Sequence, residues 1–158
     1  MTLYSPFEQR ILALSPAEVQ SSFEVVFPPV DYKEKYVCVL PQYILKAVNI
    51  GTATIWINRD EQRKVISWHG FTPLTFLPNL KKNGIGTLAH VLTMIQLVPE
   101  ANIDREFEVK HDYRVLSKGR AQQLASMGIH PRGEDIQPYL EKCINYAQRK
   151  GFTFTNPL

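Results

Sequence analysis

The chain is 158 residues long, with 44% apolar residues, 21% charged residues and a formal net charge of +3. These values are typical of one soluble globular domain with a single core, and the small positive charge does not by itself indicate a nucleic-acid-binding protein. No apolar run reaches the length that crosses a bilayer, and no basic segment followed by an apolar one suggests a signal peptide. We therefore expect a cytoplasmic protein.

The first 22 residues carry the same helix-start signal twice. Ser5-Pro6-Phe7-Glu8 and Ser15-Pro16-Ala17-Glu18 each place Ser at the N-cap, Pro at the first helical position and Glu three residues after the Ser. This pattern predicts two short helices, over residues 6–13 and 16–21.

Short segments rich in β-branched and aromatic residues follow, separated by prolines, glycines and charged turns. The clearest is a hairpin, in which 53–58 alternates between apolar and polar residues, 59–62 turns, and 63–68 returns. Segment 43–48 fits either a strand or a helical turn. The other expected strands are 23–27, 36–40 and a proline-interrupted extended segment, with a bulge or an edge position, at 71–77.

The second half of the chain contains the strongest helix pattern. Residues 87–97 have apolar side chains on nearly every side, which indicates a helix covered on most faces, and Val98-Pro99 is expected to end it. The remaining expected elements are a strand over about 105–113, a helix over 118–127, a helix over about 135–149 and a final strand at 152–154. Together they predict a single α+β domain over 1–158, with a mixed, mostly antiparallel sheet and helices packed on its faces.

Motifs of several common site classes are missing. The two cysteines, Cys38 and Cys143, lie far apart without metal-ligand spacing; we expect reduced packing residues, although counting alone leaves a disulfide open. No cluster of His, Cys, Asp or Glu has zinc spacing, and no acidic loop suits calcium. There is also no Gly-x-Ser-x-Gly nucleophile elbow and no nucleotide P-loop. We therefore expect no metal cofactor.

A basic turn with two glycines lies between the hairpin and the covered helix. Its residues are Lys81, Lys82, Asn83, Gly84, Ile85, Gly86 and Thr87. The two glycines lack a Cβ, so backbone N–H groups there can approach a ligand closely. The unpaired N–H groups and the positive dipole end of a helix start favour an anion, and the two lysines add positive charge. The turn therefore predicts a phosphate-binding site, although Asn83-Gly84 also fits an ordinary hairpin bend.

This turn resembles the pyrophosphate-binding turn of the GNAT superfamily of N-acetyltransferases, whose pattern is Arg/Gln-x-x-Gly-x-Gly/Ala between the fourth strand and the third helix. Lys81 stands where that family usually has Arg or Gln. The resemblance covers about residues 53–129 and implies an acetyltransferase-like fold. It also implies that acetyl-CoA, another acyl-CoA or an acyl carrier protein donates an acyl group to an amine acceptor. The donor's phosphates would then bind at 83–87, beside Lys81 and Lys82.

The resemblance also implies catalytic roles. The general acid of the family is a tyrosine four residues before the glycine that ends its fourth helix. Here the matching position before Gly128 is Leu124, which has no proton to give, and Tyr113 is the candidate replacement. Strand residues lining the acyl slot could take a proton from an amine. The candidate bases are His69, Glu106 and His111.

Other interpretations of the same residues stay open. His69 and His111 could be strand-end histidines bonded to backbone, and His90 fits the core. The missing tyrosine also suits a non-catalytic partner-binding or regulatory protein on an acetyltransferase-like scaffold. The expected helices at 118–127 and 135–149 could mimic a helix-turn-helix. Acidic residues interleave with the basic ones there, which does not favour nucleic-acid binding.

Overall fold

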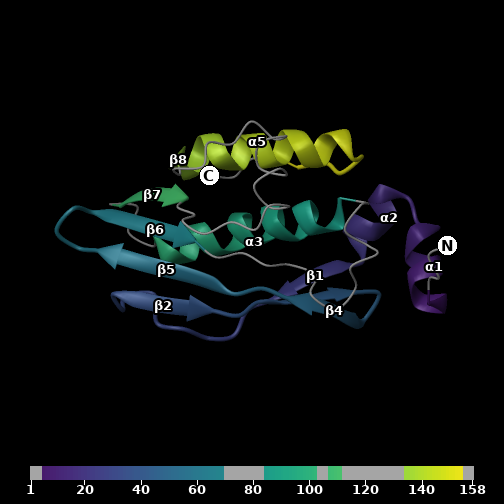
Figure 1. The fold of residues 1–158 in the computed structure, drawn as a ribbon, viewed down its shortest axis with the longest axis horizontal. Coiled ribbons are helices and arrows are strands. Elements are labelled where there is room, and N and C mark those ends of the chain that lie inside the picture. The colour runs from purple at the N-terminus through teal and green to yellow at the C-terminus, as the bar shows by residue number, and fades with distance from the viewer. Residues whose placement is uncertain (1–4, 70–83, 103–106, 112–133, 155–158) are drawn as a thin grey trace.

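The computed structural model describes residues 5–69, 84–102, 107–111 and 134–154, without the side chains of residues 69, 111 and 134. The described part is an α+β fold with four helices and two sheets (Figure 1). Its elements in chain order are α1 (Pro6–Leu12), α2 (Pro16–Ser21), β1 (Phe23–Val26), β2 (Tyr36–Val39), β3 (Gln42–Leu45), β4 (Val48–Thr52), β5 (Ile55–Asp60), β6 (Val65–His69), α3 (Ile85–Ala101), β7 (Glu108–His111), β8 (Glu134–Asp135) and α5 (Ile136–Arg149). The predicted strand at 71–77 and helix at 118–127 lie outside the described residues.

Both Ser-Pro-x-Glu motifs start helices, as predicted. The Ser5 hydroxyl accepts a hydrogen bond from the Glu8 N–H at 3.1 Å, and the Glu8 carboxylate accepts one from the Ser5 N–H at 3.0 Å. Ser15 and Glu18 repeat the pair at 3.2 and 3.0 Å. The Ser15 backbone N–H and then the Ser15 hydroxyl lower the pKa of Glu18. Because all four bonds span only three residues, local sequence is enough to specify these helix starts.

The strands form two sheets, whereas one sheet was expected. One sheet has three antiparallel strands in the order β1-β3-β4, and the other has five strands in the order β2-β5-β6-β7-β8. All neighbouring strands are antiparallel except β6 and β7, which are parallel. The predicted hairpin is confirmed as β5–β6, with Asp60 paired to Val65. Each sheet buries one face, which explains the alternating pattern that made these strands predictable.

The ambiguous segment 43–48 contains the end of β3, a two-residue hairpin turn and the start of β4. Strand β3 ends at Leu45, which pairs with Val48 at the start of β4, so only Lys46 and Ala47 connect the strands. Both have positive φ, of 52° and 61°. Two-residue hairpin turns with this backbone normally use Asn or Gly. The missing Asn-Gly signal is why the sequence does not identify this turn.

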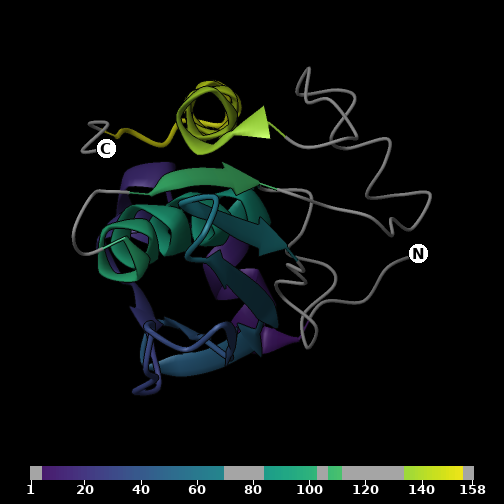
Figure 2. The ribbon, with the colours of Figure 1, turned by 90° about the vertical axis from the view of Figure 1, so that its left-hand side faces the viewer.

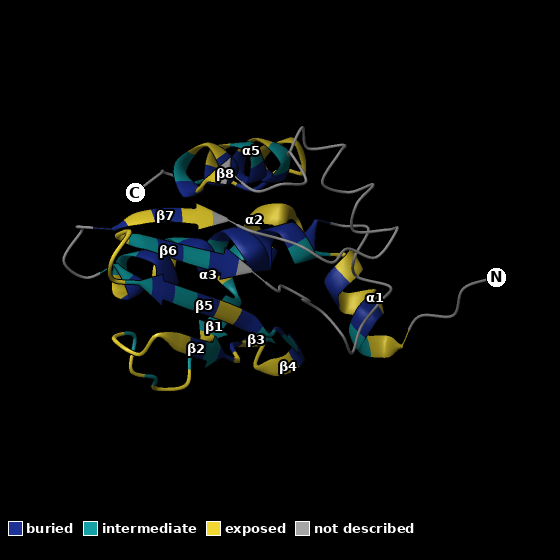
Figure 3. Ribbon diagram, turned by 60° about the vertical axis from the view of Figure 1, so that its left-hand side comes forward, coloured by how far each residue is buried: buried dark blue, intermediate teal, exposed yellow. Residues whose placement is uncertain are grey.

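Helix α3 is at the centre of the fold, as its apolar residues predicted. It lies between α5 on one side and the three-stranded sheet on the other (Figure 2). Most of its residues are buried, as are the inward residues of the strands (Figure 3). Two polar pairs bind it to its neighbours: Thr93 to Tyr43 of β3 at 2.9 Å, and His90 to Tyr139 of α5 at 2.6 Å. His90 is therefore a core residue.

The prediction that Val98-Pro99 ends α3 is wrong. The helix continues through Pro99 to Ala101, and the Asn102 N–H bonds to the Val98 carbonyl at 3.0 Å. A proline in the last turn removes one helical hydrogen bond but keeps a helical φ. The next turn is closed by the Asn102 bond, so the loss at Pro99 is tolerated.

Helix α5 follows its prediction, but the strand expected after it does not form. Its apolar stripe is buried, and Gly151 ends the helix with a φ of +98°. The stripe consists of Ile136, Leu140, Cys143, Ile144 and Ala147. Residues 152–154 are not in a strand. Instead, the side-chain amide of Gln20 donates to the Thr153 carbonyl at 2.7 Å and accepts from the Thr153 N–H at 3.1 Å. A side chain thus takes the place of a neighbouring strand.

Cys38 and Cys143 are both reduced, as expected. Among the described residues, no helix is long and apolar enough to cross a membrane.

Candidate functional site

The central feature of the candidate site is the chain path from β6 through α3 to β7. The two strands are parallel neighbours, with Val65 paired to Glu108 and Trp68 paired to His111. Their carboxyl ends therefore lie at the same edge of the sheet, which is where α/β proteins commonly bind ligands. His69 is the last residue of β6 and His111 is the last residue of β7.

The backbone register brings these two predicted bases to neighbouring positions. Residue 69 pairs with Trp56 and residue 111 pairs with Trp68. Because successive strand residues alternate between faces, positions 69 and 111 belong to opposite faces of the sheet. The other predicted residues Lys81, Lys82, Asn83, Glu106 and Tyr113 lie outside the described residues.

The predicted glycine turn leads directly into α3. Gly84 is the N-cap with a φ of 78°, and Ile85, Gly86 and Thr87 are the first three helical residues. Gly84 has no side chain with which to cap the helix, and its carbonyl accepts from the Leu88 N–H at 2.9 Å. Among the described residues, no side chain accepts a hydrogen bond from the first-turn amides. The N–H donors and the positive dipole end of this helix start therefore have no side-chain partner in the described part of the chain.

This helix start is packed closely against the end of α5. A Cβ placed on Gly84 would lie 2.9 Å from Cβ and Cγ of Lys150 and 3.3 Å from the Phe152 ring. Gly84 is therefore required for both its positive φ and its close contact. Ile85 and Thr87 are also buried, whereas Gly86 is half-buried. The first turn is thus more accessible at Gly86 than at its neighbours.

Lys150 is a basic residue at this helix start that the sequence did not reveal. Its methylene carbons lie against Gly84, and its ammonium is 5.6 Å from the centre of the Tyr146 ring. Nothing local in the sequence links Lys150 to Gly84, since only the packing of α5 on α3 brings them together. The Lys150 ammonium is therefore within a side-chain length of the helix start, and a cation in that neighbourhood adds to the attraction for an anion.

A cavity of about 230 Å³ lies beside the same helix start. Its lining is mostly apolar, with Lys150 as the charged member. The lining residues are Ile11, Leu12, Leu14, Pro16, Val19, Ile85, Lys150 and Phe152. The cavity therefore borders α3 on the side of α1 and α2, away from the carboxyl ends of β6 and β7.

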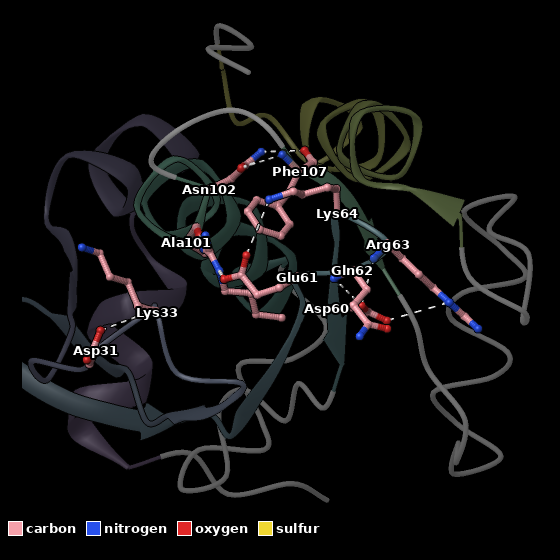
Figure 4. Close-up of polar contacts among 11 residues, drawn as sticks. Asp31, Lys33, Asp60, Glu61, Gln62, Arg63, Lys64, Ala101, Asn102 and Phe107 are labelled. Atoms are coloured by element: carbon pink, nitrogen blue, oxygen red, sulfur yellow. Dashed lines mark hydrogen bonds and ion pairs between the residues drawn. The ribbon is translucent and has the colours of Figure 1, made fainter.

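The opposite end of α3 is closed by side chains (Figure 4). Arg59 donates to the Ala101 carbonyl at 3.4 Å and to the Glu61 carboxylate at 2.8 Å. Its guanidinium carbon lies 4.0 Å from the centre of the Phe107 ring. Arg59 and then Lys64 lower the pKa of Glu61. This cluster has its partners within the protein, so we interpret it as structural.

The buried polar pairs on α3 are also structural. Thr93 bonds both Tyr43 and the Ala89 carbonyl, at 2.9 and 2.6 Å, and burial raises the pKa of Tyr43 well above its usual range. The pair of His90 and Tyr139 is equally enclosed, since His90 is only 3% exposed. Buried groups that satisfy each other hold α3 in register with its neighbours.

Among the described residues, no group of three or more His, Cys, Asp or Glu side chains is placed to hold a metal ion. Comparisons with protein-family models, with curated proteins and with solved structures found no match to this chain.

Proposed function

We propose that this protein is an acyltransferase that moves an acyl group from acyl-CoA, or from an acyl carrier protein, to an amine. The observation that carries the proposal is the start of α3. It is a helix start with a left-handed glycine and no side-chain cap, placed on the path between two parallel strands. Such an arrangement offers N–H donors to a phosphate group.

The phosphates of the donor would bind at the accessible part of the first helical turn. Gly86 and Thr87 would contribute backbone N–H groups, and the positive charge would come from Lys150 and from Lys81 and Lys82, which precede α3 in the sequence. The interaction of an anion with a helix start is worth about 0.3–1 kcal/mol when exposed and up to about 2 kcal/mol when partly buried. The remaining affinity comes from the rest of the donor.

The chemistry would take place at the carboxyl ends of β6 and β7. His69 or His111 would accept a proton as the amine attacks the thioester carbonyl, with Glu106 as a third candidate base. Tyr113 would return a proton to the departing thiolate. Holding the two reactants at this edge of the sheet would supply most of the rate enhancement.

A second candidate is a non-catalytic partner-binding protein on a similar scaffold. The burial of Ile85 and Thr87 favours it, because Lys150 and Phe152 cover part of the space that a phosphate would use. A helix-turn-helix is a more distant alternative. The apolar stripe of α5 packs on the rest of the protein, so the outward face of α5 carries charges of both signs.

Thermal unfolding with and without CoA tests the proposal. A ligand at 100 times its Kd stabilises the folded state by about 2.7 kcal/mol, or roughly 5–10 °C in Tm for a chain of this size. Gly86→Glu should remove this shift. Its carboxylate occupies the anion position, while an acidic residue in the first turn still favours the helix.

Gln137→Glu is the matched control, because residue 137 has the same position in the first turn of α5. It should keep the full CoA shift. If CoA fails to raise the Tm of the unmodified protein, or raises it equally in Gly86→Glu, the acyltransferase proposal is wrong. Duplex binding that weakens steeply with salt would support the helix-turn-helix alternative instead.

A further inference from the structure

A second hollow lies between α1 and the β3–β4 turn. Its volume is about 530 Å³, which is in the usual range for small-molecule sites. The lining is apolar apart from two cations. The lining residues are Phe7, Arg10, Ile11, Ala13, Leu14, Lys46 and Val48. Ile11 is buried at its base, whereas Val48 is 41% exposed at its rim.

Within the part of the chain that the structure describes, the two cations of this hollow have no ion-pair partner. Neither Arg10 nor Lys46 forms an ion pair with any residue that the structure describes. The Arg10 guanidinium lies 6.0 Å from the centre of the Phe7 ring. Lys46 acts weakly on Glu18, whose carboxylate already accepts the Ser15 N–H. The hollow therefore combines an apolar surface with two positive charges that no described residue pairs.

The backbone of Lys46, at the rim of the hollow, has a conformation that is energetically unfavourable for a residue with a Cβ. Lys46 and Ala47 both have positive φ, although neither is Gly or Asn. The Lys46 N–H bonds to the Ser22 carbonyl at 3.2 Å, which ties the turn to the end of α2. Strained backbone that surrounding structure maintains is more frequent at ligand-binding positions than elsewhere.

We propose that this hollow binds an amphipathic carboxylate with a single alkyl chain, such as a medium-chain fatty acid. Its chain would lie against Phe7, Ile11 and Leu14, and its carboxylate would lie between Arg10 and Lys46. A carboxylate matches both the sign and the hydrogen-bonding capacity of these two side chains. The hollow shares Ile11 and Leu14 with the cavity beside the start of α3, but no residue of α3 lines it, and the proposal does not depend on the proposed acyl transfer.

The size of the hollow favours a single chain over a peptide. Helix α1 has seven residues, which corresponds to a length of about 10 Å. A helical partner in a groove needs anchors over two turns or more, and α1 is too short to line such a groove. One alkyl chain with one anionic head group fits the apolar lining and the paired cations.

Titration calorimetry of the full chain with laurate below its micellar concentration tests this site. Laurate should bind with a stoichiometry of one, whereas dodecyltrimethylammonium, which has the same chain length and the opposite charge, should bind at least ten times more weakly. The double variant Arg10→Gln, Lys46→Asn should lower laurate affinity at least tenfold. Asn suits positive φ, so this variant removes the charge and keeps the turn.

Two further variants keep the test decisive. Ala13→Trp fills the hollow from an exposed position and should abolish laurate binding without removing a charge. Lys33→Gln combined with Arg63→Gln removes two exposed cations elsewhere and should leave the affinity unchanged. Tm measurements on each variant verify folding.

The proposal is overturned if laurate does not bind. It also fails if the cationic detergent binds as tightly, or if Ala13→Trp retains full affinity. An acidic amphipathic peptide that binds in this hollow when laurate does not would identify a protein-docking surface instead.

Discussion

The two ends of α3 are finished in different ways. At its C-terminal end, Arg59 of β5 donates to the Ala101 carbonyl at 3.4 Å. The side chain of the C-cap residue Asn102 ties this end to the Phe107 backbone, donating to the carbonyl at 2.8 Å and accepting from the N–H at 3.2 Å. At its start, the described contacts are carbon contacts, from Lys150 and Phe152 to Gly84. No side chain of the described residues caps that end.

This difference indicates which end is available to a ligand. The C-terminal end has its last carbonyl bonded by Arg59 and its cap residue bonded to Phe107, whereas a start without a side-chain cap can offer its N–H groups and its dipole to a ligand. The contrast can be tested by weakening each end in turn. Damage at the C-terminal end should affect stability alone, and damage at the start should affect both stability and CoA binding.

Arg59→Ala should have the largest effect. The substitution removes the hydrogen bonds to the Ala101 carbonyl and the Glu61 carboxylate, and it uncovers the Phe107 ring. The Arg59 side chain is only 8% exposed. We expect a loss of about 3 kcal/mol in the free energy of unfolding, measured in urea. Arg63→Ala is the control, because that side chain is 84% exposed and should contribute roughly 0–0.5 kcal/mol. Similar losses in both variants would contradict a closed C-terminal end.

Gly84→Ala should come second, with a loss of about 2 kcal/mol from the left-handed conformation and the contact with Lys150. Gly86→Ala is the matched control, since Gly86 lies within the helix and Ala should stabilise it by about 0.5–1 kcal/mol. The free energy of unfolding, again measured in urea, should fall in Gly84→Ala and rise in Gly86→Ala. Opposite changes would establish that Gly84 has a specific role. A neutral Gly84→Ala would show that the packing at this helix start is looser than described.

Asn102→Ala should cost about 1–2 kcal/mol, because it removes both bonds to Phe107. Asn49→Ala also removes two side-chain bonds, an exposed one to Gln42 and a part-buried one from the Gly51 N–H, but from a side chain that is itself exposed. Its loss should be smaller. Neither variant should change the CoA shift in Tm, and a changed shift in Asn102→Ala would mean that the two ends of α3 are coupled.

The smallest effect should be a pH dependence that comes from Glu61. Arg59 lowers the pKa of Glu61 below its ordinary value of 4.5 in the folded protein. The stabilisation is therefore present above the unfolded pKa and is lost as the pH falls through the lowered folded pKa. Glu61→Gln should be slightly less stable than the unmodified protein at pH 7. The difference should shrink as urea unfolding is repeated from pH 5 down to pH 3; a constant difference would rule out this ion pair as its source.

Much of the candidate site could be anticipated from the sequence, and the missing parts have a common cause. The glycine before a covered helix and the strand ends at His69 and His111 follow patterns within a few residues. Lys150 does not, because its place beside Gly84 depends on how α5 packs on α3. The Arg59 cluster was missed for the same reason, since Ala101 and Phe107 are distant in sequence.

The sequence by itself determined the features that depend on neighbouring residues: both capping boxes, the apolar surround of α3, the β5–β6 hairpin and the stripe of α5. Tertiary structure decided the division into two sheets, the turn at Lys46 and Ala47, and the Gln20 amide that replaces a strand at Thr153. Local hydrogen bonds and periodic burial leave a pattern in consecutive residues. A contact between segments that are distant in the sequence leaves no such pattern, because each of the two residues, taken alone, is compatible with many different neighbours.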